Sequence, residues 1–289
     1  MAGFLGTTTS FSIFEAPVPS KLDFEAVRAW AFSDAVTPEG TRLGWVGLGN
    51  AVDTDFSFGI DHGRFAALSL RVDSRKASGA ALKLQLAEAV QEELAQGGNV
   101  SNKRKKELRE AILAKLISKA EWTPALTDCL WDLEKGRLLV AASPKAALPL
   151  LERFTSTFGV DAQPYTPNED LPSFFARLSR ENVSVNGREL SCAGSATLAT
   201  PLHVEGKMAV AVQNNENTIA SALDEGLIIR KLAMIADATL EFSLDTSLTV
   251  SGLKLPKAEK GADADTDFLL KADVCVMVAD LALAIAGLA

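Results

Sequence analysis

Two consecutive segments with helical periodicity, separated by a Gly-Gly-Asn turn, constrain this chain more than any other feature. Apolar residues recur at helical spacing from about Ala80 to Gln96 and again from about Asn102 to Ala120. Gly97-Gly98-Asn99 supplies a left-handed helix end and a turn, and Ser101 is a suitable N-cap for the second helix. Helices this close in sequence predict an antiparallel helical hairpin.

The rest of the chain alternates strand-like and helix-like patterns. We expect strands at 10–15, 64–72, 128–133, 137–142, within 183–213, and at 227–235, 239–244 and 248–255, with helices at 24–31, 144–157, 216–224 and the C-terminus. Because hairpin-like strands mix with helices, we predict an α+β fold from which the helical hairpin protrudes. The expected parts are a central α+β region (1–78 and 122–170), the hairpin finger (79–121) and a C-terminal α+β region (171–289).

The apolar C-terminal stretch, Phe268 to Ala289, is long enough to approach one membrane span. Lys271, Asp273 and Asp280 interrupt it, and each charge would cost a few kcal/mol at membrane depth. A helix buried in a core or an interface is therefore the better interpretation, and no membrane partner is expected.

The N-terminus and the cysteines indicate a cytoplasmic protein. MAGFLGTTTSFSIF has no basic segment followed by a long apolar run, so it predicts neither a signal nor a transit peptide. Cys129, Cys192 and Cys275 are far apart and form no Cys-x-x-Cys pair, which favours reduced, buried thiols over disulfides or zinc.

The strongest local feature is charge. The chain of 289 residues has a net charge of −8, yet residues 101–120 carry +5, so the remainder carries −13. Consecutive cations in the first turns of a helix oppose its macrodipole and repel one another, and an external anion such as phosphate would relieve both effects. The candidate DNA-binding residues of this segment are Lys103, Arg104, Lys105, Lys106, Arg109, Lys115 and Lys119.

A second basic group, Arg71, Arg75 and Lys76, follows the strand expected at 64–72. This second group slightly strengthens the case for a nucleic-acid interface, but a charge run alone is more commonly the solvated face of a helix. The sequence alone does not decide whether the two groups face the same way.

Patterns for catalysis, cofactors or metals are weak. His62 and His203 have no metal-ligand spacing and are expected on the surface. The run 263–267 resembles the start of a calcium loop but lacks its Gly and Glu, so Asp265 or Asp267 is expected to cap the last helix. Neither a dinucleotide fingerprint nor an ATP-binding loop is present, and no cofactor or metal is predicted.

Several ordered motifs resemble the RdgC family of bacterial recombination-associated proteins. They are Ala31-Phe32 before Leu43-Gly44-Trp45-Val46, Leu70-Arg71 before Asp73-x-Arg75-Lys76, the hairpin with Leu108-Arg109-Glu110, Leu130-Trp131-Asp132 before Gly136-Arg137-Leu138, Ser143-Pro-Lys145, Ala222-Leu-Asp-Glu-Gly226, Lys231-Leu232-Ala233, Leu253-Lys254-Leu255 and Asp267-Phe268. The resemblance spans nearly the whole chain, except that residues 187–213 show no firm match.

The resemblance implies a ring-shaped homodimer that encircles double-stranded DNA without sequence preference and restrains RecA-driven strand exchange on the nucleoid. The hairpin tip and the C-terminal region would provide the two dimer contacts. Arg71, Arg75 and Lys76 would lie near the hole, and Lys103 to Lys106 with Arg109 on or near the finger. A positive lumen in an otherwise acidic protein would attract duplex DNA.

Two other functions remain open at this stage. A metal-dependent nuclease would need Asp53, Asp55, Asp61 or Asp73 to converge, and their spacing is not specific. The family also carries an exonuclease label, but no convergent acid and histidine pattern supports it here, so we expect no enzyme. The third possibility is an interaction module whose basic finger docks onto an acidic protein.

Overall fold

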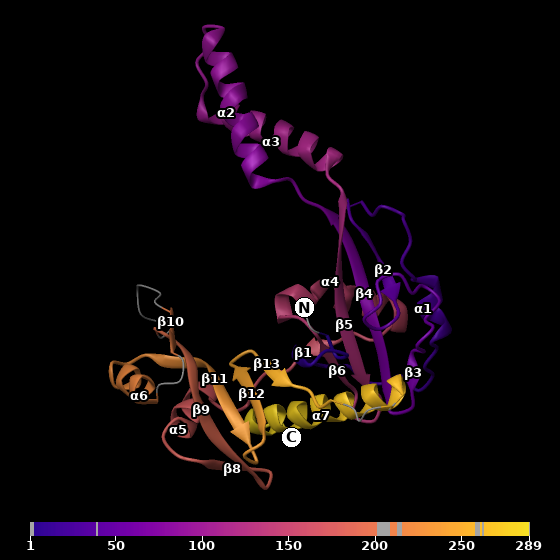
Figure 1. Ribbon diagram of the computed structural model, residues 1–289, viewed down its shortest axis with the longest axis vertical. Helices are drawn as coiled ribbons and strands as arrows, with labels where there is room; N and C mark the ends of the chain where they lie inside the picture. The colour runs from indigo at the N-terminus through magenta and orange to yellow at the C-terminus, as the bar shows by residue number, and fades with distance from the viewer. Residues whose placement is uncertain are drawn as a thin grey trace. The chain divides into compact units, whose positions relative to one another are not determined.

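The computed structural model describes residues 3–38, 40–200, 209–212, 216–257, 261 and 263–288. Within them, 13 strands form one sheet, accompanied by seven helices (Figure 1). The strands are β1 (Thr8–Glu15), β2 (Arg42–Val46), β3 (Asp61–His62), β4 (Phe65–Arg75), β5 (Trp122–Asp132), β6 (Arg137–Val140), β7 (Gln163–Pro164), β8 (Val183–Val185), β9 (Arg188–Ala199), β10 (Ala209–Val212), β11 (Ile228–Ala236), β12 (Leu240–Asp245) and β13 (Thr249–Lys254). The helices are α1 (Glu25–Ala29), α2 (Gly79–Ala95), α3 (Asn102–Lys119), α4 (Pro144–Phe158), α5 (Leu171–Leu178), α6 (Glu216–Asp224) and α7 (Ala264–Ile285). The mixed α+β class is confirmed.

The sheet follows the order β10-β9-β11-β12-β13-β1-β6-β5-β4-β2, with β3 beside β4, β7 beside β1 and β8 beside β9. The N-terminal strand β1 lies inside this path, antiparallel to both β13 and β6. Neighbouring strands such as β5 and β6, or β11 and β12, are joined by short turns and pair antiparallel. This hairpin-rich pattern explains why the strands read as alternating segments in the sequence.

The chain separates into two compact units. Unit 1 contains Met1–Ala31, Trp45–Leu70 and Thr127–Ala289, and unit 2 contains Phe32–Gly44 and Arg71–Leu126. Strands β2, β4 and β5 each continue from one unit into the other along the chain. Unit 2 therefore consists of the ends of these three strands and the two helices α2 and α3.

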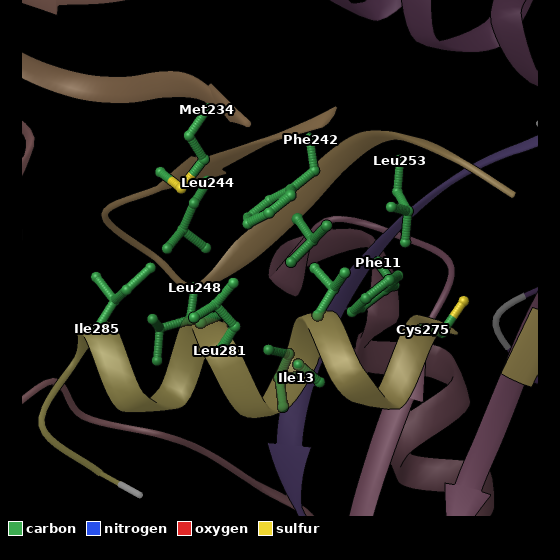
Figure 2. Close-up of a cluster of buried hydrophobic side chains, with 14 of the residues drawn as sticks. Phe11, Ile13, Met234, Phe242, Leu244, Leu248, Leu253, Cys275, Leu281 and Ile285 are labelled. Atoms are coloured by element: carbon green, nitrogen blue, oxygen red, sulfur yellow. The ribbon is translucent and has the colours of Figure 1, made fainter. Parts of the chain in front are cut away.

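The main core belongs to unit 1, where α7 packs against β1 and the strands β11 to β13. Figure 2 shows Cys275, Leu281 and Ile285 of α7 directed toward the sheet residues, among them Phe11 and Phe242. Each of these five side chains is no more than 3% exposed, so the C-terminal helix is buried in the core of its own chain.

The three charges of the C-terminal segment all have partners in unit 1. The buried Lys271 donates to the Leu5 carbonyl at 3.0 Å and pairs with Asp267 at 2.6 Å. Asp280 accepts from Lys135 and Arg137. Asp273 lies 3.7 Å from Arg64. These charges fix α7 on the sheet, and no helix among the described residues is long and apolar enough to cross a bilayer.

Three local expectations are corrected by the structure. The Pro-rich segment near 164–172 contains α5, because Pro172 sits in the first turn, where its missing N–H is harmless, while Leu171, Phe175 and Leu178 are buried. β2 lies in a Gly-rich passage for which no strand was predicted. β4 and β5 are also longer than predicted, so Arg75, expected beyond the strand, is the last residue of β4, while Arg71 lies within the range expected for the strand.

Candidate nucleic-acid interface

All ten basic residues predicted to bind DNA lie in unit 2. This unit holds 12 Lys and Arg against 9 Asp and Glu, a net charge of +3, and the rest of the chain carries −11. The ten are Arg71, Arg75, Lys76, Lys103, Arg104, Lys105, Lys106, Arg109, Lys115 and Lys119. The structure thus places the predicted cations in one compact unit and leaves the acidic excess in the other.

The helical hairpin forms where the sequence predicted it. Ser78 and Ser101 cap α2 and α3 by accepting from the backbone N–H of Ala81 and Arg104, and Gly97 adopts a φ of 78° in the connection. No residue of either helix is buried. Among their apolar side chains, Leu84, Leu94 and Ile117 are 62%, 53% and 36% exposed. The apolar stripe is therefore only partly covered by the facing helix.

The basic run at the start of α3 is partly neutralised. Arg104 pairs with Glu93 of α2 at 2.6 Å and with Glu107 at 3.2 Å, and these hydrogen bonds raise its pKa above the ordinary arginine value. Lys106 lies 3.9 Å from Glu110. In the described part of the chain, Lys103 and Lys105 have no ion pair and are exposed. The run offers fewer free charges than its sequence suggests.

Arg71 is the most engaged of the predicted residues. Its guanidinium donates two hydrogen bonds to the buried Asp73 carboxylate, at 2.8 and 2.7 Å, and lies 3.9 Å from the Phe32 ring centroid. The bond to Asp73 is the main cause of the raised pKa of Arg71. Because this carboxylate already occupies the guanidinium fork, Arg71 has a structural role in unit 2.

Arg75 has a different environment. Its guanidinium carbon lies 4.3 Å from the Trp122 ring centroid, and Nη1 donates to the Ser118 carbonyl at 3.3 Å. Within the described ranges it pairs with no carboxylate. Arg42, which the sequence analysis did not select, lies over the same Trp122 ring at 4.3 Å. No local signal marks Arg42, since it meets Trp122 only through the fold.

The other predicted cations are solvated side chains. Lys76, Arg109, Lys115 and Lys119 are exposed, and the described residues provide no ion pair for them. Lys115 and Lys119 are one helical turn apart at the end of α3 that leads to Trp122. The cations of α3 therefore extend along the whole helix, and the outermost two, Lys103 and Lys119, are about 24 Å apart along its axis.

The carboxylates considered for a nuclease have separate local partners. Asp53 accepts from Ser57, Asp61 accepts from the Gly63 N–H, and Asp73 pairs with Arg71. Asp55 is exposed in a loop. No group of three or more His, Cys, Asp or Glu side chains within the described ranges is arranged to hold a metal ion.

Two expectations about polar residues were wrong, and a third concerns a residue outside the part of the chain that the structure describes. The His62 side chain is 3% exposed, packs with tilted rings against Phe58 and Phe268, and is hydrogen-bonded to Asp265 at 2.7 Å. Its neighbours come from a loop and α7, which local sequence does not reveal. Asp263, not Asp265 or Asp267, caps α7 through the Thr266 N–H. His203 lies outside the described residues.

The cysteines and one buried carboxyl group complete the set of candidate reactive residues. Cys129 and Cys275 are buried free thiols whose pKa burial raises, and Cys192 is a half-buried free thiol. Burial also raises the pKa of Asp128, against the opposing effect of hydrogen bonds from Ser69 and the Phe4 N–H. Cys129, Cys275 and Asp128 are buried and Cys192 is half-buried, so none of the four side chains is fully exposed to solvent.

Comparison with known proteins identifies one similarity. A family model described as "RdgC: Putative exonuclease, RdgC" matches residues 12–289, including the segment 187–213 for which the motifs gave no firm match. No curated protein matches the chain.

Proposed function

The chain belongs to the RdgC family, and from this membership we propose that it binds double-stranded DNA without sequence preference as a ring-shaped homodimer. Membership fits a role related to recombination. The observation that carries the DNA-binding proposal is the charge separation, with all ten predicted cations in a unit of net charge +3 and a net charge of −11 elsewhere. Such a division concentrates duplex on one unit and repels it from the other.

The chemistry of the cations supports binding that ignores sequence. Lysines dominate the exposed set, and an ammonium on a flexible stem neutralises phosphate without reading the edges of bases. Each neutralised phosphate releases condensed counterions, so affinity falls steeply as salt concentration rises. Binding of this kind depends on the charge and spacing of the DNA phosphates and not on the base sequence.

The exposed apolar residues of the hairpin support self-association. Leu84 and Leu94 on α2 remain more than half exposed, and no residue of α2 or α3 is buried within the chain. A second copy of the hairpin would cover this surface, and a further contact through the C-terminal region would close the ring. A closed ring on duplex DNA would obstruct a RecA-type recombinase indirectly, and the proposal therefore includes a location on the nucleoid in the cytoplasm.

We propose a binding function without catalysis. The family description names an exonuclease, so a metal-dependent nuclease remains the enzyme alternative. Incubating labelled duplex with the protein and Mg²⁺, and in parallel with EDTA, separates the two functions. Intact duplex in both samples supports the binding function, whereas shortening that EDTA abolishes supports the nuclease.

The direct test is fluorescence anisotropy of a labelled random duplex at several salt concentrations, with EDTA present. We expect tight binding that a scrambled competitor displaces equally well. The double variant Lys103→Ala/Lys105→Ala should flatten the salt dependence, while Lys21→Ala/Lys145→Ala, which removes two exposed charges from unit 1, should leave it unchanged. Absence of binding at low salt would overturn the proposal and favour an acidic protein partner.

A further inference from the structure

Three strand ends meet at the place where the hairpin leaves the sheet. β2 begins at Arg42, β4 ends at Arg75 and β5 begins at Trp122, and these strands are neighbours in the order β5-β4-β2. Because neighbouring strands run in opposite directions, these three residues lie at the same end of their strands. Figure 1 shows β4 and β5 continuing from this end into α2 and α3.

The three side chains form one stack within unit 2. The guanidinium carbons of Arg42 and Arg75 both lie 4.3 Å from the centroid of the Trp122 ring. The two guanidinium carbons are therefore separated by at most twice 4.3 Å. Stacking on an indole face is favourable for each guanidinium, and it fixes side chains that are otherwise flexible.

The stack carries more positive charge than its neighbours neutralise. Arg42 pairs with Asp34 at 2.6 Å, but Asp34 is 84% exposed and therefore strongly hydrated. Arg75 has no carboxylate partner in the described part of the chain, only the Ser118 carbonyl. The Nε–H groups of both arginines are buried and donate to no hydrogen-bond acceptor among the described residues. Two like charges held close together with donors to spare favour an anion.

We propose that Arg42 and Arg75, held against Trp122, form a preorganised binding site for the phosphates of a nucleic-acid backbone. The planar guanidinium matches the oxygens of a phosphate, and the shared indole removes much of the entropy cost of ordering two arginines. This site rests on the proposed function, which it deepens by naming its strongest contacts. Arg71 does not belong to it, because Asp73 occupies its donors.

Single variants test the site by the salt dependence of duplex binding. Arg42→Gln and Arg75→Gln should each reduce the slope of log affinity against log salt by about 0.9, the value for one lost phosphate contact, and the double variant by about twice as much. Lys83→Gln is the matched control, since it removes one exposed charge from the same unit away from the stack. Its slope should equal that of the unaltered protein.

Two charge-conserving variants and one fluorescence variant add readouts that loss of folding would not mimic. Arg42→Lys and Arg75→Lys keep the charge but lose the planar fork, so we expect a slope near that of the unaltered protein with weaker binding. Trp122→Phe isolates the fluorescence of Trp122 from that of the other three tryptophans. The difference in tryptophan fluorescence between the unaltered protein and the Trp122→Phe variant should change when unlabelled duplex is added.

The outcomes separate this site from the wider proposal. Unchanged slopes for folded Arg42→Gln and Arg75→Gln variants would overturn the site while the DNA-binding function stands. Failure of the unaltered protein to bind duplex would overturn both. If the double variant lost binding to a polyglutamate peptide but kept its binding to duplex, the stack would serve an acidic protein and the phosphate site would be wrong.

Discussion

Arg104 on α3 donates two hydrogen bonds to a single oxygen of Glu93 on α2, at 2.8 and 2.6 Å. The bond joins the first turn of one helix to the last turns of the other, beside the Gly97 turn. It also removes one cation from a run of four consecutive basic residues. These bonds therefore hold the two helices together near their connection, and they leave this end of the hairpin less positive than the sequence indicates.

Glu93→Gln should strengthen duplex binding. The substitution removes the nearer of the two carboxylates on Arg104 and so leaves its Nε and Nη2 available to phosphate, while Nη1 keeps its bond to Glu107. We expect a few-fold higher affinity at low salt and a steeper salt dependence in the anisotropy assay. Glu92→Gln is the matched control, because it removes an exposed charge from the same helix without freeing Arg104. Equal effects of the two variants would show that Arg104 gains no phosphate contact.

Asp128 should make the stability of the protein depend on pH. Burial raises the pKa of this carboxyl above its ordinary value of 3.8, so the folded state holds the proton more tightly than the unfolded state. The stabilisation of the protonated form is complete below the unfolded pKa and is lost as pH rises through the folded pKa.

Urea unfolding of Asp128→Asn and of the unaltered protein, from acid to neutral pH, measures this effect. The stability advantage of the unaltered protein over the variant should shrink as pH rises and then become constant. Asp55→Asn, at an exposed carboxylate, provides the comparison for general charge effects. A stability difference independent of pH would contradict the assignment to Asp128.

Thr157→Val should destabilise unit 1 with almost no change in side-chain volume. The Thr157 hydroxyl accepts from the indole N–H of the fully buried Trp45 at 2.8 Å and donates to the Arg153 carbonyl. Removing it leaves the indole N–H buried without an acceptor, at a cost of about 1–3 kcal/mol. Thr155→Val on the same helix controls for helix propensity, and urea unfolding should show a clearly smaller loss for it. Equal losses would mean that the indole bond contributes nothing.

The three thiols should react with iodoacetamide in a fixed order. Cys129 and Cys275 are 2% and 0% exposed, and burial raises the pKa of both, so neither presents a thiolate to the reagent. Cys192 is half-buried and should be alkylated first in the folded protein, with all three modified in urea. Mass spectrometry of tryptic peptides reports each site. Rapid alkylation of Cys129 in the native state would contradict the packing of β5.

Local signals predicted the hairpin well. Both helices start after a serine cap, α2 ends beside Gly97, and the observed bounds differ by about one residue from those expected. Helix α5 was missed because Pro172 and the neighbouring prolines read as a boundary, although proline is harmless in a first turn. The family was also recognisable, because its motifs occur in order along the chain and the family match confirms them.

The candidate site was only partly predictable. Sequence located the ten cations but could not rank them, because the carboxylates that occupy Arg71 and Arg104 become neighbours through a strand and through a second helix. Arg42 was missed altogether. It joins Arg75 and Trp122 only when three strand ends, distant in the sequence, meet at one sheet edge. Pairing of this kind depends on sheet order, which a single sequence does not supply.

The position of β1 inside the sheet has a consequence for biosynthesis. This strand is synthesised well before its partner β13 and its cover α7. Roughly 250 residues separate them, which at about 5–20 residues per second means a wait of about 12 to 50 s. Phe11 and Ile13 therefore spend that time without their native cover of α7, whereas β6 is available to pair with β1 sooner.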